Sequence, residues 1–191
     1  MWKTYAWHII DRNSMQYYND GISGTTIGVN YNEDGSVDES RRPFAYKRYL
    51  NVPADCDYIT LMFGLNESNR EPGTKDSTDD STIWGAYNKV LEYLIETNPF
   101  AKIGIIISDA WLSKTQHDTQ IEIAKYWGIP YLDLKGEDTP LLIGGKYNTE
   151  LNPKAISLRN NAFQMSSSDS HPNPKANEYR STIIENWLRS L

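Results

Sequence analysis

The sequence is poor in three features that would each point to a particular class of protein. It has one cysteine, Cys56, which can form neither an internal disulfide nor a cysteine metal cluster, and we expect it to pack in the core. It has no basic excess, since the net charge is -6 and the pI about 5.1, so a nucleic-acid partner is not expected. It also lacks an apolar run of the roughly 18 residues that a membrane span needs.

The amino-terminal residues do not have the layout of a signal peptide, because Lys3, His8 and Asp11 are scattered among aromatic residues. The sequence therefore does not fix the compartment. It is compatible with a longer protein that lies outside the cell, at the cell surface or in a phage particle. The length of 191 residues suits one α/β domain, so we expect residues 1–191 to form a single domain. The 13 Tyr and 6 Trp suit carbohydrate stacking as well as ordinary packing.

The segment from Asp57 to Glu67 carries the strongest local signal. Tyr58–Phe63 is apolar or β-branched and is followed by Gly64, a pattern typical of a buried strand that ends in a tight turn. Ligands of open α/β sheets bind beyond the carboxyl ends of the strands. Asn66 and Glu67 therefore follow this strand at the place where a binding site would form.

Apolar runs and amphipathic patterns alternate along the chain. Strands are expected at Met15–Tyr18, Tyr58–Phe63, Ile103–Ile107 and Ile129–Leu134, with helices over the Trp2–Ile10 pattern, from Ile83 to the residues before Pro99, before Gly128, and after Pro174. This alternation predicts a three-layer α/β/α fold with a parallel, flavodoxin-like sheet. Residues 137–165 show little periodicity and are expected to form a long excursion over the sheet ends.

The three histidines differ in their surroundings. His8 lies in the first helical pattern and is expected to be structural, whereas His117 is among polar residues at a helix start and is expected to be solvated. His171 follows the carboxylate Asp169 and precedes a proline and the last helix. This is a suitable place for a positioned acid/base group.

Three separated motifs resemble the SGNH, or GDSL-like, hydrolase family in order and spacing. They are Asn19–Thr25 (Asn-Asp-Gly-Ile-Ser-Gly-Thr), Gly64–Glu67 (Gly-Leu-Asn-Glu) and Asp169–Pro172 (Asp-Ser-His-Pro). Each motif is weak alone, but the set is fairly specific, and the resemblance covers nearly the whole chain. It implies the SGNH hydrolase fold.

The resemblance also implies roles for four residues. The backbone N–H of Gly24 and the side chain of Asn66 would be the donors of an oxyanion hole, His171 the general base, and Asp169 the group that orients His171. The family places its aspartate three residues before the histidine, where this chain has Ser168. Ser168 or a backbone carbonyl is therefore an alternative partner for His171.

The family's nucleophile is the serine of a Gly-Asp-Ser motif at the end of the first strand, and no Gly-Asp-Ser occurs in this sequence. We expect that strand and its serine to be supplied by preceding sequence or by another chain, which would also allow a homo-oligomer. Ser23 lies in the turn of the first motif, and Glu67 stands where the family usually has aspartate. We assign Ser23 and Glu67 to substrate binding.

The resemblance implies an ester hydrolase of the Ser-His-Asp type, acting without a cofactor or metal on an ester or an acetylated carbohydrate, most simply as a carbohydrate O-deacetylase. The alternative is a catalytically inactive SGNH-like module that binds carbohydrate or has a structural role, in a phage tail or at a cell surface. A flavodoxin-like nucleotide-binding module shares the alternation of helices and strands, but no phosphate-cradling glycine loop follows a first strand.

Overall fold

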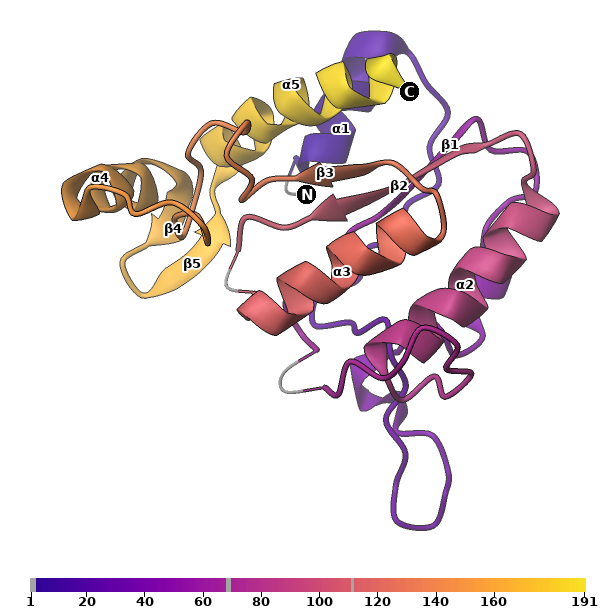
Figure 1. Ribbon diagram of the computed structural model, residues 1–191. Coiled ribbons are helices and arrows are strands. Elements are labelled where there is room, and N and C mark those ends of the chain that lie inside the picture. The colour runs from indigo at the N-terminus through magenta and orange to yellow at the C-terminus, as the bar shows by residue number, and fades with distance from the viewer. Residues whose placement is uncertain (1–2, 68–69, 111) are drawn as a thin grey trace. The chain divides into compact units, whose positions relative to one another are not determined.

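A computed structural model describes residues 3–67, 70–110 and 112–191 (Figure 1). The chain divides into two compact units: a hairpin unit, Met1–Tyr17, Ser108–Trp111 and Leu132–Leu191, and a sheet unit, Tyr18–Ile107 and Leu112–Tyr131. The helices are α1 (Tyr5–Asn13), α2 (Ile83–Thr97), α3 (Lys114–Tyr126), α4 (Pro153–Phe163) and α5 (Pro174–Ser190), with short 3-10 helices at Glu39–Arg41 and Arg48–Asn51. The strands are β1 (Tyr58–Leu61), β2 (Lys102–Ile107), β3 (Tyr131–Asp133), β4 (Gln164–Ser166) and β5 (Asp169–Pro172). The single domain expected over residues 1–191 stays a prediction.

The main sheet has the strand order β1-β2-β3. β1 and β2 are parallel, in a register that pairs Tyr58 with Lys102 and Leu61 with Ile105. Five of the six residues of β2 are buried, which is typical of a strand covered on both faces. The parallel sheet predicted from the alternating pattern is thus present.

The helices α2 and α3 contact each other in the sheet unit (Figure 1). The Thr82 side chain caps α2 by accepting a hydrogen bond from Gly85 N–H, and Ser113 and Gln116 form a reciprocal capping box on α3. The buried face of α2 packs with both strands in one hydrophobic cluster, whose members include Ile59, Leu61, Val90, Leu91, Leu94, Ile103 and Ile105. This core fixes the carboxyl end of β1.

The hairpin unit consists of helices and one antiparallel strand pair. α1 packs against α5, and Glu185 of α5 accepts hydrogen bonds from Arg12 and Asn13 at 2.6 and 2.8 Å. Arg180 of α5 forms a buried ion pair with Asp109. β4 and β5 pair as a hairpin that places Asp169 and His171 just before α5.

The strand expected at Met15–Tyr18 is wrong. α1 ends at Asn13, its C-cap Ser14 has the left-handed φ of 52°, and residues 15–18 form no strand. Met15, Tyr17 and Tyr18 are 39–47% exposed, so this apolar run covers no core. The helix predicted over the Trp2–Ile10 pattern is present as α1, which begins at Tyr5, and Trp2 lies outside the described residues.

Two further expectations need correction. The excursion over residues 137–165 contains α4, which Asn152 caps and Pro153 begins, and most of β4. The helix shows little periodicity because its described side chains are mostly not buried, Leu158 being 60% exposed.

His117 was expected to be solvated, but it is 2% exposed, and its Nδ1 lies 2.9 Å from Asp118 Oδ1. Within the described residues, no helix is long and apolar enough to cross a membrane.

Candidate functional site

Two arginines bond to the turn that carries Gly24 in the sheet unit, and Arg42 donates to the Ser23 carbonyl at 3.4 Å. Arg48 donates to the backbone carbonyl and the carboxylate of Asp20, at 2.5 and 2.6 Å, and to Thr25 Oγ1 at 2.5 Å. Gly24 has a φ of 77°, which glycine adopts without strain. Among the described residues no acceptor takes the Gly24 N–H, so this donor is free for a ligand.

Asn66 lies next to this turn although it is 42 positions away in sequence from Gly24. Its Nδ2 donates a 3.1 Å hydrogen bond to the carbonyl of Thr25, the residue after Gly24. Gly64, with a φ of 120°, begins the tight turn that brings Asn66 there after β1. An added Cβ at Gly64 would lie 2.6 Å from side-chain atoms of Leu112 and Gln120, so only glycine fits this turn. The two predicted oxyanion donors therefore belong to neighbouring turns.

Glu67 is buried beneath these turns. Its Oε1 accepts from Ile27 N–H at 2.6 Å, and its Oε2 pairs with Arg70 Nε at 2.6 Å. Arg70 in turn donates to the carbonyls of Val29 and Ser81, at 2.9 and 2.7 Å. Burial raises the pKa of Glu67 above its usual value, and the Arg70 charge opposes this shift. Both carboxylate oxygens are thus committed inside the sheet unit, where they fix the turn that carries Asn66.

Asp169 and His171 contact each other in the hairpin unit. Asp169 Oδ1 lies 2.6 Å from His171 Nδ1 and also accepts the backbone N–H of His171 at 3.0 Å. Hydrogen bonds from the backbone and the side chain of His171 lower the pKa of Asp169 below its usual 3.8. The Ser168 hydroxyl lies 3.2 Å from Ser166 Oγ instead. The contact expected between Asp169 and His171 is confirmed, and Ser168 does not replace the aspartate.

The His171 ring is open to solvent, with its side chain 73% exposed. Because Nδ1 faces the carboxylate, Nε2 is the nitrogen left for proton transfer. Gly24 and Asn66 belong to the sheet unit, and Asp169 and His171 to the hairpin unit. Their convergence on one pocket stays a prediction, as do the substrate-binding roles of Ser23 and Glu67.

Arg48 and Arg70 support the candidate site and were not anticipated. Arg70 follows Glu67 by three residues, a spacing at which opposite charges pair, so the sequence offered a signal for it. Arg48 and Asp20 are 28 positions apart and had no local signal. Within the described residues, no group of three or more His, Cys, Asp or Glu side chains could hold a metal ion.

Comparisons with known proteins identify the fold. No protein-family model and no curated protein sequence matches the chain. A solved structure from Lactobacillus plantarum matches with a TM-score of 0.70 and 22% identity, over 98% of this chain and 88% of that one. A candidate GDSL-like lipase from Bacteroides ovatus matches with a TM-score of 0.69 and 18% identity, over 99% and 79%. A possible lipase from Chitinophaga pinensis matches with a TM-score of 0.64 and 17% identity, over 97% and 88%.

These matches extend over nearly the whole chain. The chain therefore has the three-layer α/β/α fold that it shares with these solved structures, and the fold predicted from the sequence is confirmed. The resemblance to the SGNH hydrolases is confirmed at the level of the fold.

Proposed function

We propose that the chain is the larger part of an SGNH-type ester hydrolase that removes O-acetyl groups from carbohydrate, with its nucleophilic serine in a segment outside these 191 residues. The observation that carries the proposal is the 2.6 Å contact between Asp169 and His171, which leaves Nε2 available as a base. The shared fold of the GDSL-like lipase structures supports the hydrolase class.

The chemistry assigns one step to each group. Attack on the ester carbonyl builds negative charge on its oxygen, and the Gly24 N–H and the Asn66 amide would each stabilise that charge by about 3–4 kcal/mol. His171 Nε2 takes the proton of the serine hydroxyl and gives it to the departing sugar alcohol. It then takes a proton from the water that attacks the acyl-enzyme and gives it to the serine oxygen, which releases acetate and restores the serine hydroxyl. Asp169 holds the Nδ1 proton and stabilises the imidazolium that forms.

The outer edge of β1, which pairs with no other strand of the described residues, is the proposed place for the missing strand. β1 is at the end of the strand order, with β2 on one side. An unpaired edge offers a row of N–H and C=O groups that another strand can pair with. The carboxyl end of a parallel strand added there would lie at the same sheet edge as the Gly64–Glu67 turn. A serine at that end would stand beside the Asn66 donor.

Supporting roles are proposed for the remaining residues. Ser23 is exposed in the Gly24 turn and is assigned to the substrate. Glu67 has both carboxylate oxygens bound to protein groups, so we assign its effect on the substrate to the turn that it holds. The substrate partner is an ester, with no requirement for a cofactor.

The test is acetate release from 4-nitrophenyl acetate and from acetylated xylan. The given chain should be a very poor esterase, since donors and a base without a nucleophile can at most activate water. The same chain preceded by a strand ending in Gly-Asp-Ser should be faster by roughly two to three orders of magnitude, and His171→Ala should remove that gain. High activity in the given chain, lost on Ser23→Ala, would overturn the assignment of the nucleophile.

The second candidate is an inactive module that binds carbohydrate. The observation that favours it is the lack of any Gly-Asp-Ser in the sequence. It predicts that neither version of the chain releases acetate while both bind the glycan.

A further inference from the structure

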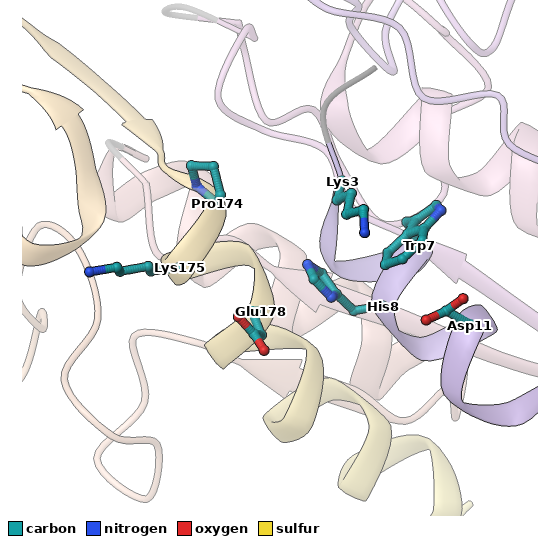
Figure 2. Close-up of a pocket in the computed structure, with 7 residues that line it drawn as sticks. All are labelled: Lys3, Trp7, His8, Asp11, Pro174, Lys175 and Glu178. Atoms are coloured by element: carbon teal, nitrogen blue, oxygen red, sulfur yellow. The ribbon is translucent and has the colours of Figure 1, made fainter.

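A cavity of about 770 Å³ lies in the hairpin unit between α1 and α5 (Figure 2). Its size is within the range of about 300–1,000 Å³ that is typical of small-molecule sites. The side chains that matter come from two helices: Lys3, Trp7, His8 and Asp11 belong to α1 or the residues just before it, and Lys175 and Glu178 belong to the start of α5. The bonds from Arg12 and Asn13 to Glu185 hold the two helices together.

The polar groups around this cavity are uncommitted. The side chains of Asp11, Lys175 and Glu178 make no hydrogen bond or ion pair with any other described residue, and Lys3 Nζ lies 3.8 Å from the centroid of the Trp7 ring. His8 Nε2 is buried and has no hydrogen-bond partner in the part of the chain that the structure describes. A buried polar atom without a partner destabilises the structure, so a ligand that bonds to it binds more favourably.

The composition of the lining selects the kind of ligand. The lining includes two lysines, Lys3 and Lys175, and two carboxylates, Asp11 and Glu178, so its formal charges balance and favour neither an anion nor a cation. The same groups offer both donors and acceptors. Trp7 adds an aromatic surface. A saccharide combines hydroxyl groups that donate and accept with apolar C–H faces, and it needs no net charge.

We propose that this cavity binds a neutral saccharide. The proposal rests on the proposed function, because the saccharide is taken to be the carrier of the ester. Lys175 follows His171 by four residues, so the cavity and the Asp169–His171 pair belong to the same unit. The C–H face of a sugar packs against Trp7, while His8 Nε2 and Glu178 bond to its hydroxyl groups.

The test measures binding apart from catalysis. Xylotetraose, which has no ester, is titrated into the His171→Ala chain, and the indole N–H resonances are followed by NMR. The Trp7 resonance should shift with saturation, and that of Trp127 in the sheet unit should not. Trp7→Ala should weaken binding about tenfold or more, whereas Trp7→Phe should keep it within about threefold. Phe100→Ala is the matched aromatic control, because Phe100 belongs to the sheet unit and is 97% exposed. This variant should bind the saccharide as tightly as the parent chain does.

Glu178→Gln and Asp11→Asn serve as second variants that leave the helices intact, and each should weaken binding several-fold. The proposal is overturned if xylotetraose, cellotetraose and chitotetraose all leave the Trp7 resonance unchanged. It is also overturned if inorganic phosphate shifts that resonance more than the sugars do, or if sugar binding survives both carboxylate substitutions. Sugar binding without acetate release in any version would refute the proposed function alone, and the reverse result would refute the sugar site alone.

Discussion

Glu67 and Asp169 make carboxylate contacts of the same length in very different surroundings. Each lies 2.6 Å from a nitrogen of its partner, Arg70 or His171. The side chains of Glu67 and Arg70 are 1% and 6% exposed, whereas those of Asp169 and His171 are 47% and 73% exposed. Burial raises the pKa of Glu67, and hydrogen bonds from His171 lower that of Asp169. Distance alone therefore does not tell a structural pair from the pair that we propose to be catalytic.

The two pairs differ in whether the partner of the carboxylate keeps a nitrogen that is not bound to protein groups. The guanidinium of Arg70 is used up by backbone carbonyls, so the Glu67 pair can only hold its turn in place. His171 keeps Nε2 available, because only Nδ1 faces the carboxylate. Breaking the first pair should change stability, and breaking the second should change activity.

The largest effect is expected for Glu67→Ala. The substitution leaves the buried Arg70 charge and the Ile27 N–H without their partner, and removing one member of a buried pair lowers the free energy of unfolding by about 3–5 kcal/mol. Urea denaturation measures this. Lys114→Ala, which breaks the exposed pair with Asp118 and leaves the contact of Asp118 with His117, is the control and should change the free energy by less than about 1 kcal/mol. Equal losses in both variants would contradict the comparison.

Asn66→Ala should reduce kcat of the serine-carrying version by about 10²–10³-fold, because one oxyanion donor is lost. The free energy of unfolding should fall by only about 1 kcal/mol, for the lost bond to the Thr25 carbonyl. Initial rates at saturating 4-nitrophenyl acetate give kcat. A rise in KM with unchanged kcat would show that Asn66 binds the substrate rather than the transition state.

Asp169→Asn should lower kcat about tenfold to a hundredfold, since the amide no longer fixes the Nδ1–H tautomer of His171. The urea midpoint should stay unchanged, because both side chains are largely exposed. The carboxylate has a lowered pKa, so its interaction with His171 is complete above pH 3.8 and is lost only as the pH falls through that lowered value. A shifted midpoint with unchanged kcat would assign the pair a structural role.

The smallest effect is expected for Glu185→Gln, which tests the hydrogen bonds that hold α1 against α5. Hydrogen bonds, first from Asn13 and then from Arg189 and Arg12, lower the pKa of Glu185 from 4.5 to about 2. The carboxylate thus contributes stability that is complete above pH 4.5 and is lost as the pH falls towards about 2. Glu185→Gln should lower the free energy of unfolding by about 1 kcal/mol at pH 7 and should reduce its further decrease below pH 4.5. Unfolding free energies at a series of pH values measure both effects. An unaltered decrease of the free energy of unfolding below pH 4.5 would refute the stabilising role of the Glu185 carboxylate.

Much of the fold could be predicted because its signals are local. The apolar run before Gly64 predicted β1, and the amphipathic pattern from Ile83 predicted α2. The contact of Asp169 with His171 followed from two nearby residues. Met15–Tyr18 was misread as a strand because its aromatic side chains resemble a core run, and only the folded chain shows them to be exposed.

The missed parts depend on distant or weak signals. Arg48 bonds to Asp20 across 28 positions, and nothing near either residue indicates the pair. α4 was missed because its described side chains are mostly exposed and show no clear apolar face. The groups that support the candidate site are therefore harder to read from sequence than the motifs they hold in place.

The central claim is that His171 activates a serine that these 191 residues do not contain, and serine labelling tests it most directly. A fluorophosphonate probe is applied to the given chain, to the version preceded by a Gly-Asp-Ser strand, and to the His171→Ala variant of that version, and the labelled residue is identified by mass spectrometry. The account predicts label on the added serine of the extended version, and none on the other two proteins. Label on Ser23 or on another serine of the given chain, or label that persists in His171→Ala, would contradict it.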